Sequence, residues 1–161
     1  MTMTQTASTE TARISRQLRR GFEGNAWHGP AVMELLADVS AARANQRPIP
    51  QAHTIWELVN HMRSVALIVY RRITATPPTG GPEEADFPEV TDTSEAAWKR
   101  SVDDLGATHR ALRAAIEAFP DSRLSEKLEG GATVYSNLHG QVQHDLYHAG
   151  QIAILKKAIN T

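Results

Sequence analysis

The chain is predicted to be an all-α protein, and three features of its sequence support that prediction. Apolar residues recur at helical spacing in several stretches, while β-branched residues are scattered instead of alternating as in a half-buried strand. Alanine and leucine, which favour helices, are plentiful. Thr54 and Glu57 form a T-x-x-E capping box, which marks the start of a helix. The 161 residues suit a single domain over residues 1–161 that buries its own core.

The first helical stretch is predicted to be long and to break or kink near residues 24–30. Its apolar stripe consists of Ile14, Leu18 and Phe22, and resumes at Val32, Leu35 and Val39. Pro30 interrupts it, because proline lacks an N–H and clashes with the preceding turn. Residues 1–8 are predicted to be a frayed tail. If the helical phase continues through the break, His28 faces inward and can line a substrate pocket; alternatively, Trp27 and His28 only pack the kink.

Two further helices each carry a histidine on an apolar stripe. The capping box starts a helix over residues 55–74, in which His61 shares a face with Leu58 and Val65. A helix from residue 93 or 94 to about 118 has a regular apolar seam that His109 interrupts. We expect His109 to be either a hydrogen-bonded core histidine or a polar group near a substrate pocket.

A long loop and a final helix complete the chain. Residues 75–92 are rich in proline, glycine and acidic residues, and a crossover of this length allows neighbouring helices to run parallel. Ser40 can cap a short helical turn that precedes the helix over residues 55–74. Thr133 can cap the last helix, over residues 134–157.

The last helix contains the clearest functional signal, the pair His144 and His148. Residues four apart on a helix share a face, so both imidazoles can bind one metal ion. The segment His144-Asp-Leu-Tyr-His148 resembles the zinc-protease motif H-E-x-x-H, but Asp145 is one carbon shorter than the glutamate that acts as base. Residues 149–161 include no His, Asp or Glu, so a third ligand must come from upstream. His61 is the best candidate, because it faces inward on another helix.

Three imidazoles would suit Zn²⁺, Ni²⁺ or another late divalent ion. Three protein ligands leave a coordination position open, which is typical of a catalytic site and allows activation of water or a thiol. Gln141 and Gln151 lie three residues from the histidine pair on the same helix face. They either orient ligands or substrate as pocket residues, or form an ordinary solvated helix edge.

Composition excludes several other classes of function. The 17 basic and 18 acidic residues nearly balance and form no basic stripe, which argues against a nucleic-acid partner. The longest apolar run, Val65 to Val69, is too short to span a membrane. The polar first residues lack the apolar core of a signal peptide, so the expected location is cytoplasmic. Without cysteine there is no disulfide, no thiolate nucleophile and no cysteine-based metal site.

Three segments resemble the DinB/YfiT-like family of metal-dependent enzymes: Ala26–Leu36, Thr54–Met62 and His139–Lys157. The resemblance extends over most of the chain from about Leu18, and the last segment is the most specific. It implies a four-helix bundle in up-down-down-up order. It also implies a three-histidine site for zinc or nickel, with His61 as the ligand from the second helix and His144 and His148 in an H-x-x-x-H-x-G-Q pattern.

The resemblance leaves two functions open. Many members of the family are homodimers, and some are transferases or isomerases that use a low-molecular-weight thiol as cosubstrate. The first hypothesis is therefore a metal-dependent hydrolase or thiol-dependent transferase, acting on a small-molecule substrate, with His28 or Gln151 positioning it. The second is a non-catalytic stress-response or binding bundle with a structural or vestigial metal site, since no clear general base accompanies the ligands.

Overall fold

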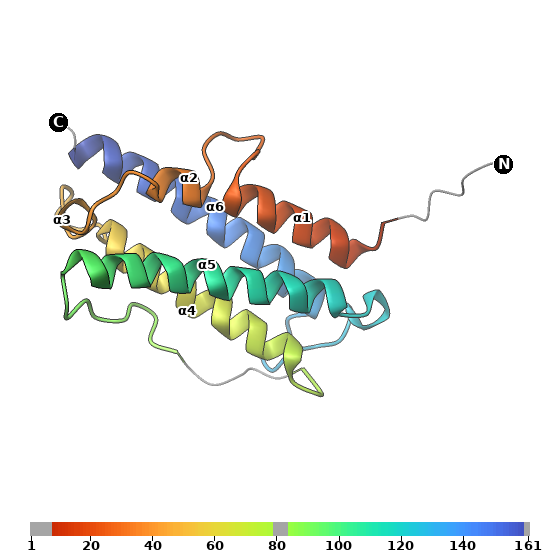
Figure 1. The fold of residues 1–161 in the computed structure, drawn as a ribbon. Coiled ribbons are helices and arrows are strands. Elements are labelled where there is room, and N and C mark those ends of the chain that lie inside the picture. The colour runs from red at the N-terminus through yellow and green to blue at the C-terminus, as the bar shows by residue number, and fades with distance from the viewer. Residues whose placement is uncertain (1–7, 79–83, 160–161) are drawn as a thin grey trace.

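The computed structural model describes residues 8–78 and 84–159, and within them the regular structure is helical, as predicted. Figure 1 shows the helices α1 (Glu10–Glu23), α2 (Val32–Leu36), α3 (Ala41–Ala44), α4 (Ile55–Thr74), α5 (Glu95–Ala118) and α6 (Val134–Ile159). A single 3₁₀ turn, η1 (Asp121–Arg123), follows α5. In the figure the long helices α1, α4, α5 and α6 pack lengthwise, with α4 beside α5 and α1 beside α6.

The helix starts follow from side-chain caps that the sequence encodes. The Thr54 side chain accepts from the N–H of Glu57 at 3.1 Å, and Glu57 accepts from the N–H of Thr54 at 2.8 Å. This reciprocal capping box begins α4, as predicted. Ser40 caps α3, and Thr133 Oγ1 accepts from the N–H of Ser136 at 3.1 Å where α6 begins. Each cap satisfies a backbone donor that has no partner inside its helix.

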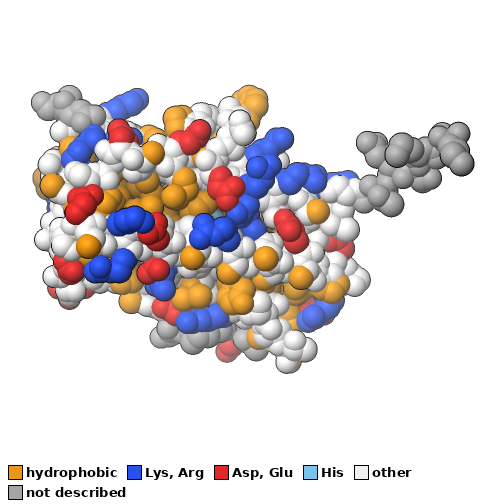
Figure 2. All heavy atoms as spheres, in the orientation of Figure 1, with side chains coloured by type: hydrophobic (Ala, Val, Ile, Leu, Met, Phe, Trp, Pro, Cys, Tyr) orange, Lys and Arg blue, Asp and Glu red, His pale blue; other side chains and the backbone are white. Residues whose placement is uncertain are grey.

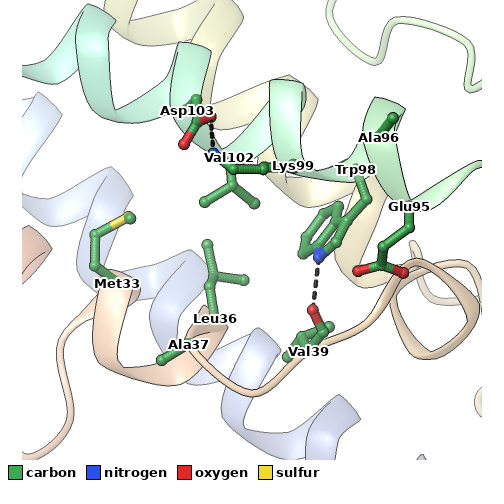
Figure 3. Close-up of a pocket in the computed structure, with 10 residues that line it drawn as sticks. All are labelled: Met33, Leu36, Ala37, Val39, Glu95, Ala96, Trp98, Lys99, Val102 and Asp103. Atoms are coloured by element: carbon green, nitrogen blue, oxygen red, sulfur yellow. Dashed lines mark hydrogen bonds and ion pairs between the residues drawn. The ribbon is translucent and has the colours of Figure 1, made fainter.

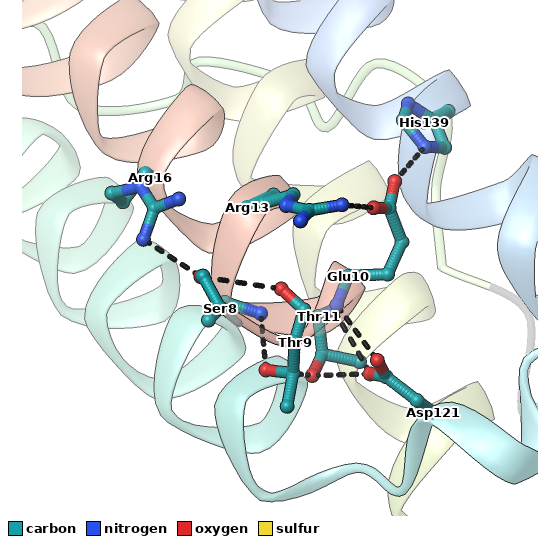
Figure 4. Close-up of polar contacts among 9 residues, drawn as sticks. Ser8, Thr9, Glu10, Thr11, Arg13, Arg16, Asp121 and His139 are labelled. Atoms are coloured by element: carbon teal, nitrogen blue, oxygen red, sulfur yellow. Dashed lines mark hydrogen bonds and ion pairs between the residues drawn. The ribbon is translucent and has the colours of Figure 1, made fainter. Parts of the chain in front are cut away.

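The start of α1 is anchored to η1, just after the end of α5, by Asp121, a contact that joins residues distant in sequence. Figure 4 shows its carboxylate accepting from the N–H groups of Glu10, at 2.7 Å, and Thr11, at 3.1 Å. These hydrogen bonds hold the pKa of Asp121 below its ordinary value. Most of the predicted tail, residues 1–7, lies outside the described residues; Ser8 accepts from Arg16 at 3.0 Å.

The predicted break after the first helix is confirmed, but the orientation predicted for His28 is wrong. The chain leaves the helix at Gly24, and α2 begins only at Val32. Asn25 has a left-handed φ of 61°, so the helical phase does not continue through the loop. His28 is exposed and Trp27 is fully exposed, at 102%. Neither side chain packs the kink, because the loop extends outward from the bundle (Figure 1).

The core consists of two apolar clusters with a polar layer between them. One cluster includes Phe22, Trp56 and Leu105, and the other includes Leu18 and Leu112. Along α5 the fully buried His109 lies between Leu105 of the first cluster and Leu112 of the second. The buried side chains of Gln141 and Asp145 occupy the same level of α6. A polar layer inside an α-helical core is costly unless its groups are paired or functional.

The outer surface carries no single dominant charge on the face that Figure 2 presents. Basic and acidic side chains are interspersed there around apolar areas, in line with the near-zero net charge. A cavity of about 390 Å³ lies between α2 and α5 (Figure 3). Trp98 forms part of its wall and donates from its indole nitrogen to the Val39 carbonyl at 2.6 Å. None of the histidines lines this cavity, so it is separate from the site below.

Candidate metal centre

The side chains of His61, His144 and His148, which together form a histidine triad, meet between α4 and α6. The His61 and His144 Nε2 atoms are 2.9 Å apart, and those of His148 and His144 are 3.1 Å apart. One ligand atom from each residue lies within 4.8 Å of the others, so the group can hold a metal ion. His61 and His148 are buried, at 8% and 5% exposure, and His144 is intermediate.

The local sequence explains why these rings converge. His144 and His148 are one helical turn apart and share a face of α6, as their spacing predicts. His61 lies on the buried side of α4, which contacts α6 directly. The Phe87 ring stacks on His61 with centroids 4.2 Å apart and on His53 with centroids 3.7 Å apart. The loop before α5 therefore covers the outer side of His61.

Hydrogen bonds at the outer nitrogens fix the orientation of two rings. His61 Nδ1 donates to the Asp86 carbonyl oxygen at 2.7 Å, and His148 Nδ1 donates to Gln151 Oε1 at 2.6 Å. Because Nδ1 carries the hydrogen in both rings, each Nε2 presents a lone pair toward the centre of the group. Metal-binding histidines have this arrangement of outer acceptor and inner lone pair.

The protonation of His148 also favours a metal ligand. Burial lowers its pKa to about 4, while the hydrogen bond to Gln151 acts in the opposite direction. The ring is therefore neutral at pH 7, and its Nε2 can donate electrons to a cation. Zn–N bonds of about 2.0–2.1 Å at tetrahedral angles would place two nitrogens roughly 3.3 Å apart. The observed 2.9 and 3.1 Å are close to that separation.

His144 differs from the other two histidines, because its outer nitrogen faces the polar layer. Its Nδ1 is buried without a hydrogen-bond partner among the described residues, and it lies 3.9 Å from Asp145 Oδ1. Gln141 donates to that same oxygen at 2.9 Å, and His109 Nε2 lies 3.7 Å from Asp145 Oδ2. Asp145 is thus the acidic group immediately behind the third ring.

The remaining atoms of the polar layer are poorly satisfied. Gln141 Oε1, Asp145 Oδ2 and both ring nitrogens of His109 have no hydrogen-bond partner among the described residues. His109 stacks on Phe22 with ring centroids 3.7 Å apart. Burial lowers the pKa of His109, although the Asp145 charge raises it. Buried polar atoms without partners are rare in folded proteins, and their presence beside three converging imidazoles indicates a functional site.

The structure places the other predicted site residues in different surroundings. Gln151 contacts His148 and lines a cavity. Gln141 is buried instead of forming a solvated helix edge, and it lines a cleft together with His144. His109 is enclosed in the core, and His28 is on the exposed loop before α2. Their proposed contact with a substrate stays a prediction. Sequence reasoning missed Asp86 and Phe87, because only the folded path of the loop brings them to His61.

Fold and site together define an all-α protein with a three-histidine group that can bind a metal ion. Residues 26–152 match the DinB superfamily, so the chain belongs to that family. The expected family membership is therefore confirmed. Comparisons with curated proteins and with solved structures gave no match. Within the described residues, no helix combines the length and apolar character that crossing a membrane requires.

Proposed function

We propose that this protein is a metal-dependent enzyme that uses one late divalent ion, Zn²⁺ or Ni²⁺, held by His61, His144 and His148. The observation that carries the proposal is the convergence of three Nε2 atoms while the outer nitrogens of two rings donate to protein acceptors. Lone pairs that face one another at about 3 Å repel unless a cation or protons lie between them. A single proton on His144 Nε2 can form a hydrogen bond to His61 Nε2 or to His148 Nε2, but not to both.

The proposed reaction is a hydrolysis or the transfer of a small thiol. An ion held by these three histidines would lower the pKa of a bound water or thiol toward neutrality. The Asp86 carbonyl and Gln151 hold the rings of His61 and His148 in place. Phe87 and the helix contacts exclude water from the outer faces of these rings. The substrate would be a small molecule that approaches from the side of His144, the most exposed of the three.

A structural site in a non-catalytic bundle is the alternative. The specific observation in its favour is the position of Asp145, the acidic residue adjacent to the ligands. Its side chain is 1% exposed and faces Gln141 and His109, so it cannot reach a substrate as a general base. In this alternative the ion would contribute its binding free energy to folding, and the metal-free chain would unfold.

Cobalt substitution distinguishes the two functions. We expect the Co²⁺-loaded protein to change its visible spectrum when 2-mercaptoethanol or azide is added, because an open position can exchange its ligand. The metal-free protein should remain folded by circular dichroism. A spectrum that does not respond to either ligand, together with unfolding on metal removal, would establish the structural alternative instead.

Replacement of Gln151 by leucine is expected to weaken metal binding by about 10–100-fold, the usual effect of losing the outer partner of a metal-binding histidine. The variant removes the acceptor of the His148 Nδ1 hydrogen but keeps all three ligands. Competition with a chromophoric chelator measures the affinity. Gln143→Leu is the matched control, because Gln143 is exposed on the same helix and should bind metal like the wild type. Equal affinities in the two variants would contradict the assigned role of Gln151.

The proposal also includes the order of the four long helices and the oligomeric state of the protein. The long connection between α4 and α5 supports an up-down-down-up order of α1, α4, α5 and α6. A homodimer, which the family resemblance implies, stays a prediction, as does the use of a thiol cosubstrate.

A further inference from the structure

A cleft begins at the triad and extends between α4 and α6. Its volume is about 380 Å³, and His144 forms one end of it. On α4 the lining residues Val65, Ile68 and Arg72 follow His61 at intervals of three or four residues, on one helix face. On α6, Gly140 and Asn137 precede His144 at similar intervals. The seven helical steps from residue 137 to residue 144 rise by about 10 Å, so the cleft is elongated.

The walls of this cleft are largely apolar. Val65, Ile68 and Val69 form the α4 side, and Ala132 and Gly140 contribute from the opposite side. Polar side chains also line it: His144 and Gln141 lie near the triad, and Asn137, Ser136 and Arg72 lie farther along the two helices. This distribution suits a molecule with a polar reacting end and an apolar body.

Gly140 keeps the middle of the cleft open. A Cβ atom built on this residue would meet no atom within 4 Å, although Gly140 lies inside a helix where glycine is unfavourable. Gly140 therefore makes α6 less stable, but a larger side chain at this position would extend into the cleft.

A second cavity also lies near the triad, but on the outer side of the His148 ring, away from the three converging nitrogens. It has a volume of about 290 Å³ and includes Leu58, Gln151 and Ile154 in its lining. The Gln151 oxygen faces His148 Nδ1, the nitrogen directed away from the centre of the group. In contrast, the α4–α6 cleft is lined by the ligand His144 itself.

We propose that the α4–α6 cleft binds the substrate, and that the substrate carries an elongated apolar arm lying between Val65, Ile68 and Gly140, with its reacting end at the triad. This inference rests on the proposed metal-dependent function for the reacting end. The position of the apolar arm depends only on the cleft.

Hydroxamic acids of two lengths test the proposal, because their head group binds divalent metals. We expect octanohydroxamic acid to bind the Zn²⁺-loaded protein at least about a hundredfold more tightly than acetohydroxamic acid, since burying each added methylene contributes roughly a threefold gain or more. Isothermal titration calorimetry measures both affinities. Equal affinities of the two acids in the wild type would overturn the proposal.

A pair of glycine variants locates the arm. Gly140→Leu should abolish most of the gain from the longer chain while leaving acetohydroxamic acid binding nearly unchanged. Gly150→Leu is the matched control, because Gly150 lies in the same helix, is exposed, and also has no atom within 4 Å of a built Cβ. It should keep the full gain. A gain that survives in Gly140→Leu would place the arm elsewhere and overturn the proposal.

A metal-free measurement separates failure of the cleft from failure of the metal site. Anilinonaphthalene sulfonate is a fluorescent apolar probe, and its binding to the chelator-treated protein should weaken several-fold in Gly140→Leu but not in Gly150→Leu. If no metal binds but this difference appears, the proposed function fails and the cleft assignment stands. If metal binds but the two glycine variants behave alike with every probe, the cleft assignment fails alone.

Discussion

Replacement of His148 by alanine is expected to lower the affinity for Zn²⁺ or Ni²⁺ by more than about a hundredfold, since loss of an outer partner alone costs 10–100-fold. His148 contributes one of three converging nitrogens, and its ring is neutral at pH 7 because burial lowers its pKa to about 4. Chelator competition measures the affinity directly. Thermal unfolding provides a second readout, because an ion at a hundred times its Kd stabilises the wild type by about 2.7 kcal/mol.

The matched control for this variant is His139→Ala. His139 lies on the same helix, but its ring pairs with Glu10 at 3.5 Å (Figure 4) and is not one of the three converging histidines. It should bind metal like the wild type and show the same stabilisation. Loss of metal in both variants would indicate non-specific binding by surface histidines, and retention in both would exclude His148 as a ligand.

Replacement of Asp145 by leucine is expected to lower the free energy of unfolding by about 3 kcal/mol, because it leaves a buried donor of Gln141 without its acceptor and removes the carboxylate that faces the buried His109 ring. The carboxylate is 1% exposed and accepts from Gln141 at 2.9 Å. Urea unfolding of the chelator-treated protein measures this cost without a contribution from metal. Asp103→Leu is the control, because Asp103 is exposed on α5 and should change stability by less than about 0.5 kcal/mol.

A double variant distinguishes a polar network from a simple packing defect. In Asp145→Leu with His109→Leu, apolar groups replace both members of the 3.7 Å pair, and such replacements are often neutral. We expect the double variant to be more stable than Asp145→Leu alone. A double variant whose loss equals the sum of the two single losses would show that the two residues do not act together.

Much of the helical fold could be predicted from the sequence, because its signals are local. The Thr54–Glu57 box begins α4, and the predicted ends of α5 and α6 lie within two residues of the observed ones. The spacing of His144 and His148, with His61 on an apolar stripe, is enough to predict the three-histidine group that the fold assembles. Helical periodicity carries this information because it fixes which side chains share a face.

The surroundings of the site could not be predicted, because they depend on tertiary contacts. His28 does not face inward as predicted, because eight residues outside helical geometry separate Glu23 from Val32 and break the helical periodicity. Asp86 meets His61 only through the path of a loop that follows α4. The burial of Gln141 could not be predicted from helical periodicity either, because α6 packs against α1, α2 and α4 and is therefore buried on more than one face.

The metal content of the wild-type protein, purified without a histidine tag, tests the central claim most directly. Elemental analysis after growth with zinc and nickel should find about one late divalent ion per chain. Less than about a tenth of an ion per chain, both as purified and after the chelator-treated protein is reloaded with each metal, would contradict the account. The three histidines would then be polar residues of the bundle interior instead of a metal centre.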